Sequence, residues 1–232
     1  MPLNKGDFVT IEYTVRIKET GNIVDTSNEE VAKKENIYDP DKLYGPTLLI
    51  LGRGWINELV EEEILKSNVG EEKTVEVPPE KAFGPRDPEK IRVFSLRDFE
   101  KRGYKVNVGD IVEVNGQRGV VKNISGGRVV VDFNHPLAGK TLVYTVKVVR
   151  KLENMNEKLL ALSSRILKIP EGELAVEYLN EEKKVVVKIP AKYITRRDLG
   201  YAKVSLATEV FDVFRDSVDK LVYQEEVAKQ SS

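Results

Sequence analysis

Few side chains of this chain could act as nucleophiles or metal ligands. Its 232 residues include no cysteine and a single histidine, His135. These counts exclude a thiol nucleophile, a thiolate or His-rich metal site, and a serine–histidine pair away from His135. The glycines at residues 52–54 lack the spacing and the downstream lysine of a phosphate-binding loop. We therefore predict no metal and no cofactor, which leaves aromatic side chains and single carboxylates as candidates.

Two separated segments hold several of these aromatic side chains. Residues 78–85 are P-P-E-K-A-F-G-P, and residues 134–149 are N-H-P-L-A-G-K-T-L-V-Y-T-V-K-V-V. Each is typical of part of one small β-rich domain, and the sequence between them indicates a compact domain of its own. A binding domain with a second domain inserted at its rim suggests a protein that holds other polypeptides.

Composition limits the classes of function. The chain is 41% hydrophobic and 32% charged, with a formal net charge of −1. It can therefore build cores, and it lacks the charge excess of a broad phosphate-binding surface. No apolar run approaches the ~20 residues that span a bilayer, and the N-terminus lacks a signal peptide's apolar core. We expect a cytoplasmic protein without a membrane partner.

The first half of the chain alternates strands and turns. Four segments are rich in β-branched residues, which predicts strands. They are residues 7–18, 23–27, 47–52 and 73–77. Residues 28–46, called the flap below, are polar and predict a surface loop. Residues 55–65 have apolar side chains at helical spacing.

The pattern changes after residue 87. Residues 95–102 predict a short helix with Ser95 as its N-cap. Three short strands follow, at residues 111–114, 118–124 and 128–133. The pairs Asn115-Gly116 and Gly126-Gly127 lie between them and favour hairpin turns. Strand returns at 142–152, followed by a helix at 157–169 and strands at 174–179 and 183–189. Thr195 to Asp198 could cap a further helix, and the pattern at 204–227 fits both helix and strand.

Five motifs occur in order along the chain: V-x-I-E-Y-T-V, G-x-I-V-D-T-S, L-x-L-G-R-G-W-I-x-E-L, V-P-P-E-K-A-F-G and N-H-P-L-A-G-K-T-L-V-Y. Together they resemble the FK506-binding-protein (FKBP) type of peptidyl-prolyl cis-trans isomerase. The split before N-H-P-L-A-G-K is similar to the SlyD-like members, in the long archaeal-type form with an inserted chaperone domain. That domain is known as insert-in-flap, a name that does not refer to residues 28–46. The resemblance covers residues 1–152.

The resemblance implies an α+β, multidomain fold. Its first part would be a twisted antiparallel sheet wrapped on one helix, formed by residues 1–86 and 137–152. Residues 87–136, called the insert below, would be a small β-rich chaperone domain, and residues 153–232 a C-terminal α+β domain. The implied activity is prolyl isomerisation and folding assistance on unfolded or nascent polypeptides with X-Pro bonds.

The same motifs supply site residues. The resemblance implies that the prolyl pocket is formed by Tyr13, Asp25, Ile56, Phe83, Leu142 and Tyr144, with Val24, Leu49 and Trp55 as substrate-binding neighbours. Family members often have Tyr in place of Phe83 and Phe in place of Val24, so a hydroxyl contact to substrate is lost. The chain ends without the His-rich nickel-binding tail of many SlyD-like proteins, so metal binding is not carried over.

An apolar surface on the insert would hold unfolded segments near the pocket. The candidates for substrate binding there are Ile91, Phe94, Phe99 and Tyr104, although several must also form the core of the insert. Taken singly, Tyr13, Phe83 and Tyr144 are more typical of core aromatics, and Asp25 of a turn. Only their joint match to the family order favours a site.

Two alternatives stay open. Residues 109–121 look somewhat like small β-barrels that bind ribosomal RNA, but residues 87–136 carry nine basic and seven acidic side chains, a weak excess for nucleic acid. The C-terminal region could be a second client-holding surface or a self-association module, and we favour a homodimer formed through it.

Overall fold

The computed structural model describes residues 2–101 and 103–227. The chain divides into two compact units: Met1–Arg16, Gly21–Val75 and Val143–Ser232 form the first, and Ile17–Thr20 with Glu76–Leu142 form the second. The fold class is α+β, as the sequence predicts. The three-domain division stays a prediction, because these units follow different boundaries.

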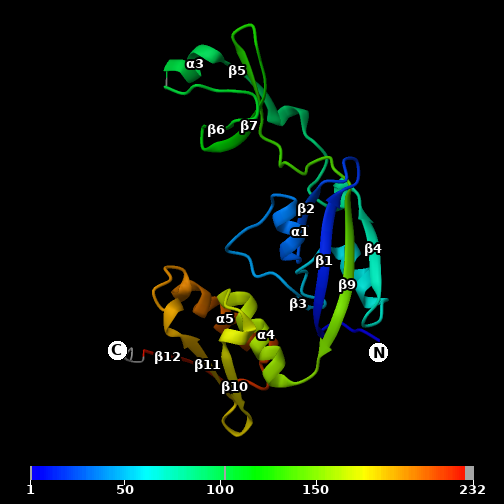
Figure 1. Cartoon of the computed structure of the whole chain (residues 1–232), viewed down its shortest axis with the longest axis vertical. Coiled ribbons are helices and arrows are strands. Elements are labelled where there is room, and N and C mark those ends of the chain that lie inside the picture. The colour runs from blue at the N-terminus through cyan, green and yellow to red at the C-terminus, as the bar shows by residue number, and fades with distance from the viewer. Residues whose placement is uncertain (1, 102, 228–232) are drawn as a thin grey trace. The chain divides into compact units, whose positions relative to one another are not determined.

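A five-stranded sheet forms half of the first unit (Figure 1). Its strands are β1 (Phe8–Ile17), β2 (Ile23–Thr26), β3 (Thr47–Ile50), β4 (Glu72–Val77) and β9 (Leu142–Leu152). The order is β2-β1-β9-β4, and β3 pairs antiparallel with β1 so that Val9 faces Leu49. The ends of all five strands were predicted within two residues, because their β-branched side chains alternate at the spacing of a strand.

Two short helices accompany this sheet. Helix α2 (Glu58–Leu65) begins at Asn57, whose side chain accepts from the Leu59 N–H at 3.1 Å, and it buries Val60 and Ile64. Helix α1 (Glu29–Lys34) lies in the flap and begins at Asn28, whose side chain accepts from the Val31 N–H. The sequence predicted only a loop there, since a six-residue helix with two apolar side chains, Val31 and Ala32, gives little periodicity.

The C-terminal region forms a small α/β layer within the first unit. It contains α4 (Met155–Leu167), β10 (Ala175–Leu179), β11 (Lys184–Pro190), α5 (Leu199–Val213) and β12 (Lys220–Glu226). Strands β10 and β11 are antiparallel, whereas β11 and β12 are parallel because α5 carries the chain back across the sheet. The ambiguous residues 204–227 are thus helix to Val213 and strand from Lys220.

One hydrophobic core joins this layer to the sheet. Phe8, Leu48 and Ile50 share a buried cluster with side chains of α4, β11 and α5. The rings of Phe8 and Phe214 lie 5.5 Å apart, and Arg53 bridges to Glu209 and Asp212 at 2.7 and 2.6 Å. The C-terminal region therefore completes the burial of β1 and β3.

The second unit has a four-stranded antiparallel sheet of order β5-β8-β7-β6. These strands are β5 (Ile91–Ser95), β6 (Ile111–Val114), β7 (Gln117–Ser125) and β8 (Arg128–Asp132), and α3 (Leu96–Lys101) follows β5 directly. The three-stranded meander and the short helix were predicted correctly, whereas β5 was missed. Gly119 is required in β7, because a Cβ there would lie 2.6 Å from Val131 Cγ1.

Single 3-10 turns connect several elements: η1 (Pro79–Lys81), η2 (Pro88–Lys90), η3 (Glu171–Glu173), η4 (Asn180–Glu182) and η5 (Ala191–Tyr193). Among the helices built from the described residues, none has the length and apolar character needed to cross a membrane.

Candidate active site

Three side chains meet where β1, β2 and the flap come together. Strands β1 and β2 pair antiparallel, with Thr14 opposite Thr26 and Val15 opposite Asp25, so Tyr13 and Asp25 are diagonal neighbours on one face of the sheet. The Tyr13 hydroxyl donates to Asp25 Oδ2 at 3.1 Å. Lys42 Nζ contacts Asp25 Oδ1, donates to the Tyr13 hydroxyl at 3.1 Å and donates to the Thr26 carbonyl at 2.8 Å.

Charges in this cluster are fixed by their surroundings. Burial raises the pKa of Tyr13, and the nearby Asp25 carboxylate raises it further. Burial alone would lower the pKa of Lys42, but its hydrogen bonds to Asp25 and Tyr13 outweigh that effect and raise it. Tyr13 is therefore a neutral phenol and Lys42 an ammonium ion at neutral pH.

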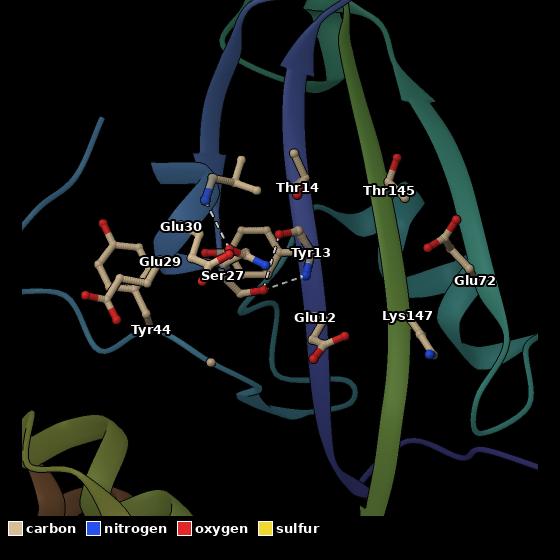
Figure 2. Close-up of a pocket in the computed structure, with 13 residues that line it drawn as sticks. Glu12, Tyr13, Thr14, Ser27, Glu29, Glu30, Tyr44, Glu72, Thr145 and Lys147 are labelled. Carbon is tan, nitrogen blue, oxygen red and sulfur yellow. Dashed lines mark hydrogen bonds between the residues drawn. The ribbon is translucent and has the colours of Figure 1, made fainter. Parts of the chain in front are cut away.

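Backbone contacts hold Tyr13 in this position. Its N–H donates to Ser27 Oγ at 2.9 Å, and its carbonyl accepts from the Ser27 N–H and from Thr26 Oγ1. Figure 2 shows residues that line a hollow on this sheet, with Glu12 and Thr14 on β1, Thr145 and Lys147 on the adjacent β9, and Glu29 and Glu30 on the flap side of β1. This hollow of about 520 Å³ is lined largely by polar and acidic groups.

Tyr144 of β9 belongs to the same neighbourhood as Tyr13. It is half-buried, and burial raises its pKa, with smaller contributions from the Asp25 carboxylate and from Tyr13. The structure brings Tyr13 and Asp25 into direct contact, and Tyr144 lies in β9, the strand next to β1 in the sheet. A pocket shared by the three residues stays a prediction.

The remaining predicted residues of the first unit have different surroundings. Leu49 is 3% exposed and packs in the core, where it pairs with Val9. Ile56 and Val24 are half-buried, at the entrance to α2 and next to Asp25. Trp55 lies beneath the Arg165 guanidinium, whose carbon is 4.5 Å from the ring centroid.

Phe83 and Leu142 belong to the second unit. The Phe83 ring, 46% exposed, stacks on His135 with centroids 4.2 Å apart and an interplanar angle of 1°. The Gly139 N–H donates to the Gly84 carbonyl at 2.8 Å, so the two segments separated in the sequence are joined here. Leu142 is buried at the start of β9. A shared pocket with Tyr13 stays a prediction for both residues.

The root of the insert is held by a polar cluster around Asp132. Its carboxylate pairs with Arg86 at 2.5 Å and accepts from Asn134 N–H groups at 3.0 and 2.8 Å. Asn134 in turn accepts from the Asp87 N–H at 2.9 Å. These contacts close the two ends of the insert against each other.

The insert candidates divide between core and surface. Phe99 is buried with Val112, Val121 and Val129, and Phe94 packs against that cluster, while Ile91 is half-buried. Tyr104 is 61% exposed. It borders a groove of about 320 Å³ with Phe99 at its base and Ile111, which is 74% exposed, at its edge. Ile111 and Val108 are exposed apolar residues that the sequence reasoning did not select.

Two cations were also missed. Lys42 is one of several lysines in a polar flap, and Arg165 is one polar residue on an amphipathic helix, so neither has a distinguishing local pattern. Among the described residues, no group of three His, Cys, Asp or Glu side chains could hold a metal ion.

A second cavity, of about 860 Å³, lies between the flap and α4 in the first unit. Tyr13, Lys42, Tyr44 and Leu48 line one side, and α4 contributes Arg165. Tyr13 thus faces a space that is bounded partly by the C-terminal region.

Comparisons with known proteins agree with the motif resemblance. A family model described as "FKBP26, IF domain" matches residues 92–137. A short-type peptidyl-prolyl cis-trans isomerase of Methanocaldococcus jannaschii is 38% identical over 146 residues, which is 63% of this chain and 92% of that protein.

Bacterial relatives carry similar names. The FKBP-type 16 kDa peptidyl-prolyl cis-trans isomerase of Escherichia coli is 36% identical over 108 residues, 44% of this chain and 72% of that protein. SlyD of Treponema pallidum is 33% identical over 161 residues, 68% of this chain and 82% of that protein.

Among solved structures, the three FKBP domains of wheat FKBP73 match with a TM-score of 0.35 and 14% identity, over 66% of this chain and 42% of that one. The relatives give no support to the nucleic-acid alternative, and they confirm the predicted resemblance. The chain belongs to the FKBP-type peptidyl-prolyl cis-trans isomerases.

Proposed function

We propose that this isomerase acts on X-Pro bonds of unfolded or nascent polypeptides at the site formed by Tyr13, Asp25 and Tyr144. Ile56, Val24, Leu49 and Trp55 are its proposed neighbours, and Phe83 and Leu142 are proposed on the family pattern. The observation that carries this assignment is the hydrogen-bonded cluster of Tyr13, Asp25 and Lys42 at the margin of a large cavity.

The reaction needs no bond to be made or broken. Rotation about a prolyl peptide bond is slow because it breaks amide resonance, with a barrier of ~18–20 kcal/mol. In the twisted transition state the amide is less polar than in its planar ground state. A pocket with aromatic walls therefore favours the transition state over the hydrated ground state.

Each member of the cluster has a distinct part in this mechanism. The Tyr13 ring is a wall, and its hydroxyl, engaged by Asp25 and Lys42, orients that wall. Lys42 compensates the Asp25 charge, so that the carboxylate can remain beside the Tyr13 ring. Tyr144 supplies a second aromatic surface.

Replacement of Tyr13 tests the proposal. Tyr13→Ala should lower kcat/KM for a short prolyl peptide at least tenfold, while Tyr13→Phe should lower it less. Tyr193→Phe is the matched control, because Tyr193 also donates its hydroxyl to a carboxylate, Glu173, at 2.8 Å. A folded Tyr13→Ala protein with unchanged catalysis would remove Tyr13 from the site.

The insert is proposed to hold unfolded chains. Its exposed Tyr104, Val108 and Ile111, with the groove above Phe99, provide apolar surface for extended segments. A chain held there would have a raised effective concentration at the prolyl site. Phe94 and Ile91 remain weaker candidates, because they support the core of the insert.

A homodimer through the C-terminal region is also proposed. Tyr201, Val204 and Phe211 are 82%, 67% and 40% exposed along one side of α5, and β12 is an edge strand with Val222 42% exposed. Such apolar surface is typical of a protein contact. Sedimentation of the full chain tests the dimer, since a monomer mass at micromolar concentration would exclude it.

The cytoplasmic location stays a prediction, which cell fractionation would test.

A further inference from the structure

The cavity between the flap and α4 has a wall that the family motifs do not describe. Residues 153–232 lie outside the region of motif resemblance, yet α4 supplies Ala161, Ser164 and Arg165 to the lining. The opposite side includes Tyr13 and Leu48. A substrate chain that leaves Tyr13 through this cavity would therefore meet the last turn of α4.

Arg165 is held with its guanidinium plane fixed. Its guanidinium carbon lies 4.5 Å from the centroid of the Trp55 ring, and Nη1 donates to the Leu48 carbonyl at 3.1 Å. A guanidinium has five N–H donors, and the Leu48 carbonyl takes one of them. Within residues 2–101 and 103–227, no carboxylate forms an ion pair with Arg165 within 4.0 Å.

The lining includes seven other charged groups, and five of them already interact with neighbouring groups through their side chains. The seven groups are Glu29, Asp39, Asp41, Lys42, Arg150, Lys168 and Glu171. Glu29 pairs with Lys33 at 2.6 Å, Lys42 with Asp25, and Arg150 with Glu171 at 4.0 Å. Asp39 accepts from the Asp41 N–H at 2.9 Å.

Burial leaves the Arg165 charge poorly compensated. Burial lowers the pKa of Arg165, since water is partly excluded and no carboxylate lies close enough to offset the lost hydration of the guanidinium. The group remains a cation at neutral pH. A carboxylate that entered the cavity would meet free N–H donors in a fixed plane, the geometry that favours bidentate binding.

We propose that Arg165 forms a subsite for an acidic side chain of the polypeptide substrate, a few residues from the isomerised proline. This inference rests on the proposed function, because Tyr13 connects the cavity to the prolyl site. The C-terminal region would thereby set substrate preference in addition to supporting the fold.

Matched peptides test the subsite on the full-length protein. Each peptide has the same prolyl bond and either Glu or Gln at one position, from three residues before the proline to three after it. At one or two positions, we expect the wild type to have a KM about five- to tenfold lower for Glu, as a charge-assisted hydrogen bond implies. Added salt should reduce the difference.

Variants assign this preference to Arg165. Arg165→Met should abolish the difference between Glu and Gln peptides, and Arg165→Lys should retain part of it. Arg150→Met is the matched control, because Arg150 lines the same cavity but already pairs with Glu171. That control should keep the preference.

A purely structural role for Arg165 gives a different result. Trp55 is the single tryptophan of the chain, so its fluorescence reports loss of the stacked guanidinium. Altered fluorescence in Arg165→Met with an unchanged Glu preference would overturn the subsite. Equal KM values for all wild-type Glu and Gln pairs would also overturn it, even where Arg165→Met fails to fold. A different result would contradict the proposed function, namely unchanged isomerisation of neutral peptides by the Tyr13→Ala variant.

Discussion

The ammonium of Lys42, in the flap, forms an ion pair with the carboxylate of Asp25 in β2. Both side chains are partly exposed, at 26% and 49%, so the pair adds little to stability, about 0–1 kcal/mol. Its importance lies in position, because the same ammonium also contacts the Tyr13 hydroxyl. The pair thereby connects the flap to the aromatic wall of the site.

Lys42→Met should impair catalysis more than stability. We expect kcat/KM for a prolyl peptide to fall about three- to tenfold as Tyr13 and Asp25 lose their shared partner, with a change of about 1 kcal/mol or less in unfolding free energy. Peptide isomerisation and urea unfolding measure the two effects. Lys33→Met is the control, since Lys33 is a flap lysine that pairs with Glu29. Equal activity of the two variants would contradict the role of Lys42.

The same cluster predicts how stability depends on alkaline pH. The folded pKa values of Tyr13 and Lys42 both lie above the ordinary values of 10.0 and 10.5. Their stabilising contribution is therefore complete below about pH 10 and is lost as pH rises through the folded values. Urea unfolding at a series of pH values should show a shallower alkaline loss in the Tyr13→Phe, Lys42→Met double variant. Parallel curves for the two proteins would contradict this linkage.

Phe83 should contribute to catalysis through its exposed ring. Its stacking on His135 fixes the ring while leaving 46% of the residue exposed. Phe83→Ala should lower kcat/KM about tenfold, whereas Phe83→Tyr should retain or raise activity, because family members often have Tyr there. His135→Ala separates support from direct contact. It should lower activity less than Phe83→Ala does, and the reverse order would assign the main effect to His135.

The insert should act on protein substrates and not on short peptides. Deletion of residues 88–132 should spare peptide isomerisation and slow proline-limited refolding of an unfolded protein. The point variant Ile111→Ser tests the surface without removing the fold, and it should weaken refolding activity two- to fivefold. Val93→Ser is its control, since Val93 is 60% exposed on β5, at the other edge of the sheet from β6. Equal loss on peptide and protein substrates would contradict this division.

The C-terminal region should stabilise the isomerase sheet. Phe214 packs on Phe8 in the shared core, so Phe214→Ala should cost about 3–5 kcal/mol of unfolding free energy. Truncation after Leu152 would expose Phe8, Leu48 and Ile50 and should lower the melting temperature further. Thermal unfolding of the three proteins measures the series. A truncated chain as stable as the full one would show that the sheet needs no support from this core.

Much of the fold could be predicted because local patterns matched tertiary packing. Strands β1 and β9 alternate over many residues, and hairpin pairs such as Asn115-Gly116 mark turns independently of distant contacts. Helix α1 and strand β5 were missed because each is short and has little apolar periodicity. The cap at Asn28 and the pairing of β5 with β8 stabilise them instead.

The candidate site was predictable only where it follows ordered motifs. Tyr13 and Asp25 occur in adjacent strand motifs, and antiparallel pairing brings them within hydrogen-bonding distance. Lys42 and Arg165 have no such motif, because a flexible cation on a loop or helix gains its role only from the groups around it.

The sequence by itself determined the family, the α+β class, the absence of thiol chemistry and most strand positions, since these follow from residue types and short-range spacing. Only the tertiary structure decided that Lys42 joins Tyr13 to Asp25, that Phe99 is core while Ile111 is exposed, and that Arg165 stacks on Trp55. Such contacts join residues as far as 110 positions apart in the sequence. No local pattern encodes them, because burial and charge compensation depend on what the whole chain packs beside each group.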